Sequence, residues 1–377
     1  MAVMDLTSEQ ELIRDTVREF VAEEVEPRVD ESDAAQEFPE DVWDGLAELD
    51  LTGLTVPEEY GGFDADTVTL SLVNEELGYG HLSVATALSV QHLATSCIRE
   101  FASEDQREEW LPGMARGRPV GAFALSEPHA GSNPAEMSTE ARREGDEYVI
   151  NGRKQWVTNG ERAGVVVLFA KTDPHDPGTV TQFLLPADAE GVEVGKKEDK
   201  LGLRASDTTT LVLDDARVPA ENRLTEVGKG LKAAFSVLTE GRVAIASQAV
   251  GLAQAALDDA VDYASEREQF GEPIVEHQAI AQKLADMQTN VQAARLLARD
   301  AARQNENGVD PMSASMAKYF AGETAVEVAS EAVQIHGGYG FTKDFDVERY
   351  YRDAKITTIY EGTSEIQKKI IARHLTE

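Results

Sequence analysis

Residues 148–160 read YVINGRKQWVTNG, and this stretch decides the fold class of the middle of the chain. The β-branched and aromatic run at 148–150 is followed directly by Asn151-Gly152, and the run at 156–158 is followed by Asn159-Gly160. An Asn-Gly pair next to apolar runs favours a tight hairpin turn, because both residues tolerate positive φ. We therefore predict two β-hairpins within this stretch.

Three more apolar runs follow at 165–170, 179–185 and 208–213, and they are bounded by Gly, Pro and Asp. Short strands at this spacing are typical of an antiparallel barrel or sandwich. The sequence thus predicts a β domain from about Val120 to Val227.

The chain before these strands has helical periodicity. Leu6-Thr7-Ser8 precede Glu11, which favours a capping box, and apolar residues then recur at 13, 17, 20 and 21. The runs 70–77 and 84–98 continue this pattern. Pro112-Gly113 and then Gly117–Pro119 interrupt it and predict a boundary there.

The chain after the strands is helical again, with long Ala-rich stretches at 241–264, 280–303 and 311–335. Long helices in sequence favour a bundle. The predicted architecture is α+β and multidomain. It has an N-terminal α-helical domain (1–119), a middle antiparallel β-barrel or sandwich domain (120–228) and a C-terminal four-helix-bundle-like domain (229–377).

Composition excludes several classes of protein. The 377 residues carry a net charge of −34, which argues against non-specific binding to nucleic acid or anionic lipid. So large a charge on a chain with 42% hydrophobic residues favours adaptation to high salt over an ordinary acidic protein. Cys97 is the only cysteine, which excludes an intramolecular disulfide and cysteine-based zinc sites. We see no signal peptide and no membrane-spanning run, so we expect a cytoplasmic protein.

Common catalytic motifs are missing from the sequence. It has no P-loop, no G-x-G-x-x-G after a strand, no H-E-x-x-H and no G-x-S-x-G, and the seven His lack metal-ligand spacing. We therefore predict no metal site.

Four segments combine Gly with polar residues. The first is GAFALSEPHAGSN at 121–133, in which Ser126 and Ser132 can donate to a carbonyl or a phosphate, and the second is QWVTNG at 155–160. The third is REQFGEP at 267–273, whose arginine suits a phosphate. The fourth joins QIHGGYG at 334–340 to IYEGTSEIQ at 359–367.

Each segment taken alone also has an ordinary structural interpretation. The first is a strand with a turn, the second a buried Trp, and the third an interhelical loop with a surface ion pair. The Gly residues of the fourth end a long helix. Thr363 can cap the next helix, and Glu361 is then either a first-turn acid or a carboxylate whose pKa is raised by an aromatic neighbour.

Together and in this order, the four segments resemble the FAD-dependent acyl-CoA dehydrogenase family over nearly the whole chain. The resemblance implies oxidation of an acyl-CoA thioester to a trans-2-enoyl-CoA, in which a Glu removes the α-proton and a hydride passes to the flavin. It also implies an electron-transfer flavoprotein as acceptor and a homotetramer built as a dimer of dimers. Glu361 matches the family's base.

The resemblance also assigns the other site residues. Those against the flavin are Phe123, Leu125, Ser126, Trp156, Val157 and Thr158. Those that reach the FAD across a subunit contact are Arg267, Phe270, Gln278, Gln334, Ile335, Gly337 and Gly338, and the cofactor site is completed by Thr363 and Glu365. The substrate side consists of Ser132, at the CoA phosphates and also part of the cofactor site, with Arg242, Tyr360 and Gly362.

Other details stay open in the sequence. Some family members place the base just before the Arg that Arg242 matches, where this chain has Gly241, and Glu240 is one residue away. Thr239, His129 and Asn133 depart from common family residues, while Val90, Gln91 and Leu93 are candidates for the wall of the acyl pocket. The alternatives to an acyl-CoA dehydrogenase are an acyl-CoA oxidase, a decarboxylating variant and an inactive binding relative. The sequence does not reveal the length or branching of the substrate's acyl chain.

Overall fold

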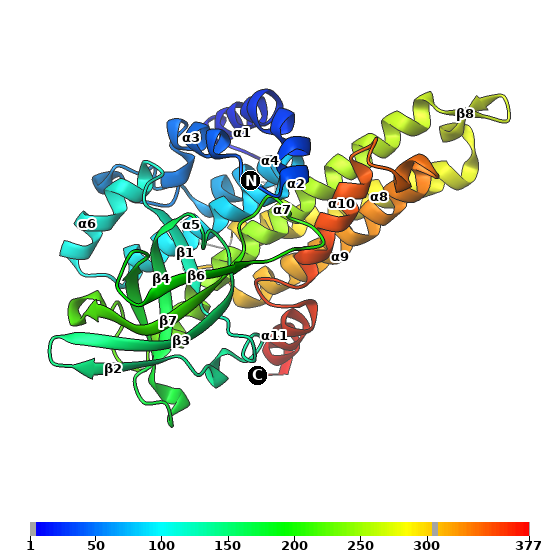
Figure 1. Ribbon diagram of the computed structural model, residues 1–377. Coiled ribbons are helices and arrows are strands. Elements are labelled where there is room, and N and C mark those ends of the chain that lie inside the picture. Colours follow the sequence, from blue (N-terminus) through cyan, green and yellow to red (C-terminus); the bar gives the residue numbers. More distant parts are fainter. Residues whose placement is uncertain (1–4, 304–307, 377) are drawn as a thin grey trace.

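A computed structural model describes residues 5–303 and 308–376. The N-terminal part is helical, and two of its helices, α4 and α5 in the list that follows, pack on the first long helix of the C-terminal part (Figure 1). Its helices are α1 (Ser8–Phe20), α2 (Val29–Ala35), α3 (Glu40–Glu48), α4 (Thr67–Gly80), α5 (Leu82–Phe101) and α6 (Glu104–Ala115). A capping box does start α1, but it joins Thr7 to Gln10 rather than involving Glu11.

The predicted break at Pro112-Gly113 is wrong, because α6 continues through both residues to Ala115. The helix ends instead near Gly117, whose φ of +88° suits glycine. A Cβ on Gly117 would lie 2.8 Å from Cβ of Ala47. The later of the two predicted interruptions is therefore the one that redirects the chain.

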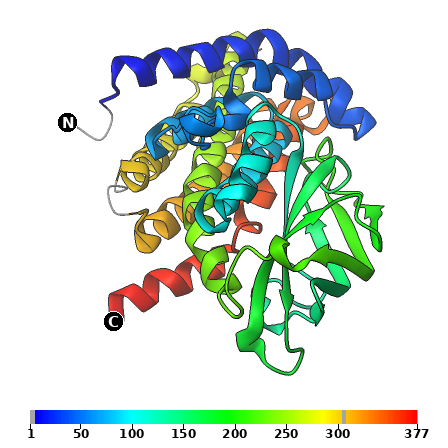
Figure 2. The same cartoon turned by 90° about the vertical axis from the view of Figure 1, so that its left-hand side faces the viewer.

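The middle part is a curled sheet that lies to one side of the packed helices (Figure 2). Its strands are β1 (Val120–Ala124), β2 (Glu140–Glu144), β3 (Glu147–Val157), β4 (Ala163–Lys171), β5 (Val180–Pro186), β6 (Val192–Lys197) and β7 (Thr209–Pro219). Their order is β1-β4-β2-β3-β7-β6, and β5 pairs with β4. The predicted β domain is confirmed, but β1 pairs with β4 in parallel. The long connection between these two strands allows this crossover.

The two predicted hairpins are wrong. Asn151 and Gly152 lie inside β3, where the register against β7 shifts between Ile150 and Gly152. A Cβ on Gly152 would lie 2.4 Å from Oγ1 of Thr139, so this glycine serves a bulge at a close approach. Asn159 and Gly160 do form a turn, but the strand that follows it pairs with β1, β2 and β5 instead of β3.

The C-terminal part confirms the predicted long helices. They are α7 (Gly230–Glu266), α8 (Gln278–Arg303), α9 (Pro311–His336), α10 (Val347–Ala354) and α11 (Ser364–Thr376), with a small ribbon, β8 (Glu268–Gln269) and β9 (Glu272–Pro273), between α7 and α8. Helix α7 packs closely on α4, since a Cβ on Gly251 would lie 2.0 Å from the carbonyl oxygen of Glu75. Within 5–303 and 308–376, no helix is long and apolar enough to cross a membrane.

Candidate active site

Glu361 lies in the short loop before α11, in a tightly held turn. Its φ is +54° and that of Gly362 is +92°. The side-chain amide of Gln367 donates to the carbonyls of Glu361 at 3.2 Å and Gly362 at 2.9 Å. Oγ1 of Thr363 accepts from the backbone N–H of Ile366 at 3.4 Å and caps the helix. These contacts fix the direction in which the Glu361 side chain leaves the backbone.

Glu361 is half-buried as a residue, but one oxygen of its carboxylate is enclosed by protein. Its Oε2 atom is buried and has no hydrogen-bond partner among the described residues. Burial raises the pKa of Glu361, while the positive charges of Lys318 and Arg242 oppose that rise. The preceding residue, Tyr360, is half-buried and directs its hydroxyl to Gln248 at 3.3 Å. A buried carboxylate oxygen without a partner is available to accept a proton.

A small cavity adjoins this carboxylate. It is lined by Thr55, Leu70, Ser89, His92, Leu93, Ser96, Val237, Glu240, Gly241 and Ala244. A Cβ on Gly241 would lie 3.6 Å from Oε2 of Glu361 and 3.2 Å from Cδ2 of Leu93. The absent side chain of Gly241 therefore leaves the space between the cavity and the carboxylate open.

The candidates for the pocket wall differ in their surroundings. Leu93 lines the cavity, whereas Gln91 is occupied elsewhere. Its side-chain amide donates to the carbonyl of Met114 and accepts from the backbone N–H of Gly121, which ties α5 to β1. Val90 is buried but does not line the cavity.

Glu240 lines the same cavity, but its carboxylate has polar partners. It accepts a hydrogen bond from Thr67 at 3.4 Å and lies 3.9 Å from the guanidinium of Arg99. Burial raises its pKa, and Arg99 opposes that rise. Glu240 thus has polar partners that Oε2 of Glu361 lacks.

The first Gly-containing segment is built around a buried ion pair. Glu127 accepts from Nζ of Lys154 at 2.8 Å and from the backbone N–H and hydroxyl groups of Ser138 and Thr139. Both charged side chains are fully buried. Burial alone would raise the pKa of Glu127, but Lys154 and these hydrogen bonds hold it at about 2. The pair fixes the loop whose exposed end carries Ser132.

The predicted flavin-facing residues come from two adjoining segments. The ring of Phe123 in β1 packs on Phe169 at 4.9 Å. The carbonyl of Ser126, next to Leu125, accepts from the backbone N–H of Gln155, which joins this loop to the end of β3. Trp156 there is 60% exposed with a φ of +63°, so its ring faces outward on a constrained backbone.

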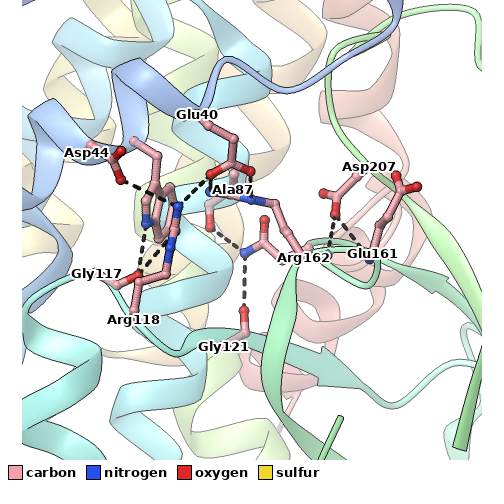
Figure 3. A network of polar contacts seen from close by, with 11 residues as sticks. Glu40, Asp44, Ala87, Gly117, Arg118, Gly121, Glu161, Arg162 and Asp207 are labelled. Carbon is pink, nitrogen blue, oxygen red and sulfur yellow. Dashed lines mark hydrogen bonds and ion pairs between the residues drawn. The ribbon is translucent and has the colours of Figure 1, made fainter. Parts of the chain in front are cut away.

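The turn after Val157 and Thr158 is anchored to three elements (Figure 3). The side-chain amide of Asn159 donates to the carbonyls of Ala87 in α5 and Gly121 in β1. Asp207 accepts from the backbone N–H groups of Glu161 and Arg162.

Arg162 also pairs with Glu40 at 2.8 Å. Its guanidinium carbon lies 3.9 Å from the centre of the Phe38 ring and 4.3 Å from that of Trp43. The turn is therefore held rigidly against the N-terminal helices.

A second concave region lies at the far end of α7, near β8 in Figure 1. It is lined by Tyr263, Arg267, Gln269, Ile274, Ile335, His336, Gly337, Gly338, Tyr339, Thr342 and Asp344. No atom lies within 4 Å of a Cβ placed on Gly337 or Gly338, so this floor is open to a ligand. Phe270 is 97% exposed nearby, and Gln278 and Gln334 are exposed too.

The structure thus gathers the predicted site residues in three places, of which the first is the pair of segments at 123–132 and 156–158 described above. Glu361, Tyr360, Gly362, Thr363 and Glu365 lie together before and at the start of α11, and the positive charge of Arg242 acts to lower the pKa of Glu361. The residues from Arg267 to Gln278 and from Gln334 to Gly338 lie at the opposite end of the long helices (Figure 1). One copy of the chain does not bring these two groups together.

Two residues at the site escaped the sequence reasoning, Lys318 and Gln367. Lys318 lies within α9 and is 1% exposed, with its Nζ donating to the carbonyl of Gly362 at 2.7 Å. Its position four residues after Ala314 and three before Ala321 places it on the apolar stripe of the helix. A lysine on such a stripe is the signal that could have revealed it.

Comparison with known protein families then decides the assignment. Models of the acyl-CoA dehydrogenase N-terminal, middle and C-terminal domains match residues 7–118, 122–216 and 228–376. The chain belongs to the acyl-CoA dehydrogenase family. It is therefore an oxidoreductase of that family.

Individual relatives match over almost the full chain. The short-chain specific acyl-CoA dehydrogenase of Rattus norvegicus mitochondria is 43% identical, over 99% of this chain and 91% of its own. Butyryl-CoA dehydrogenase from Megasphaera elsdenii has a solved structure with a TM-score of 0.96 and 40% identity, covering 99% of this chain and 100% of its own. A glutaryl-CoA dehydrogenase from Mycobacterium smegmatis, solved in complex with FADH2, has a TM-score of 0.94 and 34% identity, covering 98% and 95%.

Proposed function

We propose that this acyl-CoA dehydrogenase family member oxidises an acyl-CoA thioester to a trans-2-enoyl-CoA, with FAD as cofactor and Glu361 as base. The observation that carries the proposal is the buried Oε2 of Glu361, which has no hydrogen-bond partner among residues 5–303 and 308–376 and lies next to a residue that lines a cavity. The electrons would pass on to an electron-transfer flavoprotein, as the family resemblance implies.

The residues present fit FAD. The open floor at Gly337 and Gly338, beside Arg267, suits a pyrophosphate, and exposed Trp156 offers an aromatic face to a flavin ring. When bound, FAD supplies the acceptor for the β-hydride. Because the two groups of residues lie at opposite ends of the long helices, we propose that a second copy completes each cofactor site, within a homotetramer.

The chain's own groups would handle the proton. Oε2 of Glu361 removes the α-proton as the α-C–H bond breaks, and the carboxylate becomes a carboxylic acid. The charge that develops on the thioester oxygen needs a hydrogen-bond donor, and the family resemblance assigns the backbone N–H of Glu361 to that role. Oε2 of Glu361 is buried, so its basicity is not lost to hydration.

The cavity supports a short acyl chain as substrate. It is small, and its lining residue Gly241 is the point at which an added Cβ would approach both Leu93 and Oε2 of Glu361. The names of the Rattus norvegicus and Megasphaera elsdenii relatives agree with this class of substrate.

We expect Leu93→Ala to shift the preference of the enzyme towards longer acyl chains by about 10-fold in kcat/KM, since each added methylene in an apolar pocket is worth about 1–3 kcal/mol. The measurement is kcat/KM over a series of straight-chain acyl-CoAs. Val90→Ala, on the same helix and away from the cavity, is the matched control. An unchanged chain-length profile for Leu93→Ala would place the acyl chain elsewhere.

The overall proposal is tested by anaerobic titration of the purified protein with acyl-CoAs of graded length and branching. Loss of the oxidised flavin absorbance with one substrate class supports cofactor and reaction together. A yellow protein whose flavin is not reduced by any acyl-CoA would contradict the proposed reaction but would still support binding of FAD. Formation of hydrogen peroxide in air at a rate rivalling the dye-linked reaction would favour an oxidase instead.

The acidic composition leads to a separate expectation about salt. With a net charge of −34, self-repulsion should weaken the fold and the proposed tetramer in dilute buffer. We expect the melting temperature, the tetramer fraction and activity all to rise with KCl concentration. Equal values in dilute buffer and concentrated KCl would contradict adaptation to high salt.

A further inference from the structure

Lys318 is a buried amine that forms no ion pair within the described part of the chain. It lies in the middle of α9 and is 1% exposed. Its one hydrogen bond there runs from Nζ to the carbonyl oxygen of Gly362, at 2.7 Å. Burying an ammonium group without a directly bound carboxylate is costly, so a function is needed to explain the residue.

The carbonyl that Lys318 binds belongs to the turn that presents the base. Glu361 and Gly362 both have positive φ, and only Gly362 is a glycine. The conformation of Glu361 is therefore strained, and it persists because the surrounding structure holds it. Lys318 holds the turn from α9, and Gln367 holds it from α11.

The same ammonium contributes positive charge to the Glu361 carboxylate without binding it. Lys318 from α9 and Arg242 from α7 both favour the ionised form of Glu361. Neither donates a hydrogen bond to Oε2, which has no partner in the part of the chain that the structure describes. A direct hydrogen bond would occupy the lone pair that accepts the proton, whereas a nearby charge favours ionisation and leaves that lone pair free.

We propose that Lys318 is a positioning residue for α-proton abstraction: it fixes the Glu361–Gly362 turn and supplies the charge that keeps the base ionised. This inference rests on the proposed function. The charged groups that act on Lys318 are Glu361 itself, Arg242 from α7, Glu323 from its own helix and Glu365 from α11. Burial lowers the pKa of Lys318 to about 8, with Glu361 opposing, so its ammonium is charged at neutral pH.

Two substitutions separate the two roles. Lys318→Gln removes the charge and keeps a donor for the Gly362 carbonyl, while Lys318→Met removes both and suits an apolar site. Lys369→Met, at an exposed position on α11, is the matched control. Flavin content and circular dichroism establish which variants are folded and loaded.

The rate of flavin reduction by acyl-CoA is measured against pH by stopped flow. The base must be ionised to act, so the rate rises through its pKa. Loss of a nearby cation should move that rise to higher pH by about one unit or more in both Lys318 variants. Lys318→Met should also lower the limiting rate at high pH, because the turn is released, and Lys369→Met should change neither.

Infrared titration of Glu361, identified by difference against Glu361→Gln, gives a readout that needs no turnover. An unchanged Glu361 titration midpoint in a folded Lys318→Gln protein overturns the electrostatic role. A wild-type protein that no acyl-CoA reduces would defeat the proposed function. The infrared midpoint would then still decide whether Lys318 sets the ionisation of Glu361.

Discussion

Glu361→Gln is expected to slow flavin reduction by acyl-CoA by about 10³-fold or more while FAD stays bound. Gln has nearly the shape of Glu but cannot accept the α-proton, and general bases typically contribute 10²–10⁴-fold. Oε2 of Glu361 is buried, and no described group is hydrogen-bonded to it and placed to take over. The measurement is single-turnover reduction under anaerobic conditions, with flavin content read from the spectrum.

Glu240→Gln is the matched control for that experiment. Glu240 lines the same cavity, is half-buried and also has a raised pKa, so it is the obvious competitor. Its carboxylate is hydrogen-bonded to Thr67 and lies near Arg99, and we expect its loss to lower the rate by less than about 10-fold. If Glu240→Gln slows flavin reduction more than Glu361→Gln does, Glu240 is the base and the assignment of Glu361 is wrong.

Lys154→Met is expected to lower the free energy of unfolding by roughly 3–5 kcal/mol, because it leaves Glu127 buried without its counterion. Urea denaturation measures this directly. Glu127 and Lys154 also hold the loop from Leu125 to Ser132, so FAD affinity should fall in the same variant.

The double variant Glu127→Gln with Lys154→Met should recover part of the lost stability, because no unpaired charge is then buried. Lys196→Met, at an exposed ion pair with Glu198, should change stability by less than about 0.5 kcal/mol. Equal losses of the free energy of unfolding in Lys154→Met and Lys196→Met would show that the buried ion pair stabilises the fold no more than the exposed one.

The pair also predicts how stability depends on pH. The pKa of Glu127 is held at about 2 in the folded protein, below the ordinary Glu value of about 4.3. The stabilisation is therefore present above that ordinary value and is lost as the pH falls towards 2. Denaturation midpoints of wild type and the double variant should converge over this acidic range.

The sequence predicted the fold class because its periodicities are strong. Long Ala-rich stretches became α7, α8 and α9, and the β-branched runs became strands. Local turn signals failed where tertiary contacts decided the outcome. Asn151-Gly152 has the composition of a hairpin turn, yet Gly152 lies inside β3, where a side chain would clash with Thr139. Nothing within a few residues of Gly152 carries that information.

The candidate site was predicted unevenly for the same reason. Motif residues such as Glu361 are visible in the sequence, because they stand next to glycine and aromatic residues. Lys318 reaches Gly362 from 44 residues away along the chain, and only the packing of α9 against the loop brings them together. Gln91 looked like a wall residue of the acyl pocket, but its hydrogen bonds to Met114 and Gly121 depend on how β1 lies against α5.

Helix α7 imposes a constraint on how this chain can change in length. It is one uninterrupted helix of 37 residues, about 55 Å at 1.5 Å per residue, with Arg242 in its first half and Arg267 immediately after its end. A one-residue insertion between them would rotate one end against the other by about 100° and turn Arg267 away from Gly337 and Gly338. Even seven inserted residues, close to two full turns, would move Arg267 by about 10 Å along the axis. Viable insertions or deletions in this stretch should therefore need a matching change in α9, whereas surface loops such as 172–179 tolerate changes in length more readily.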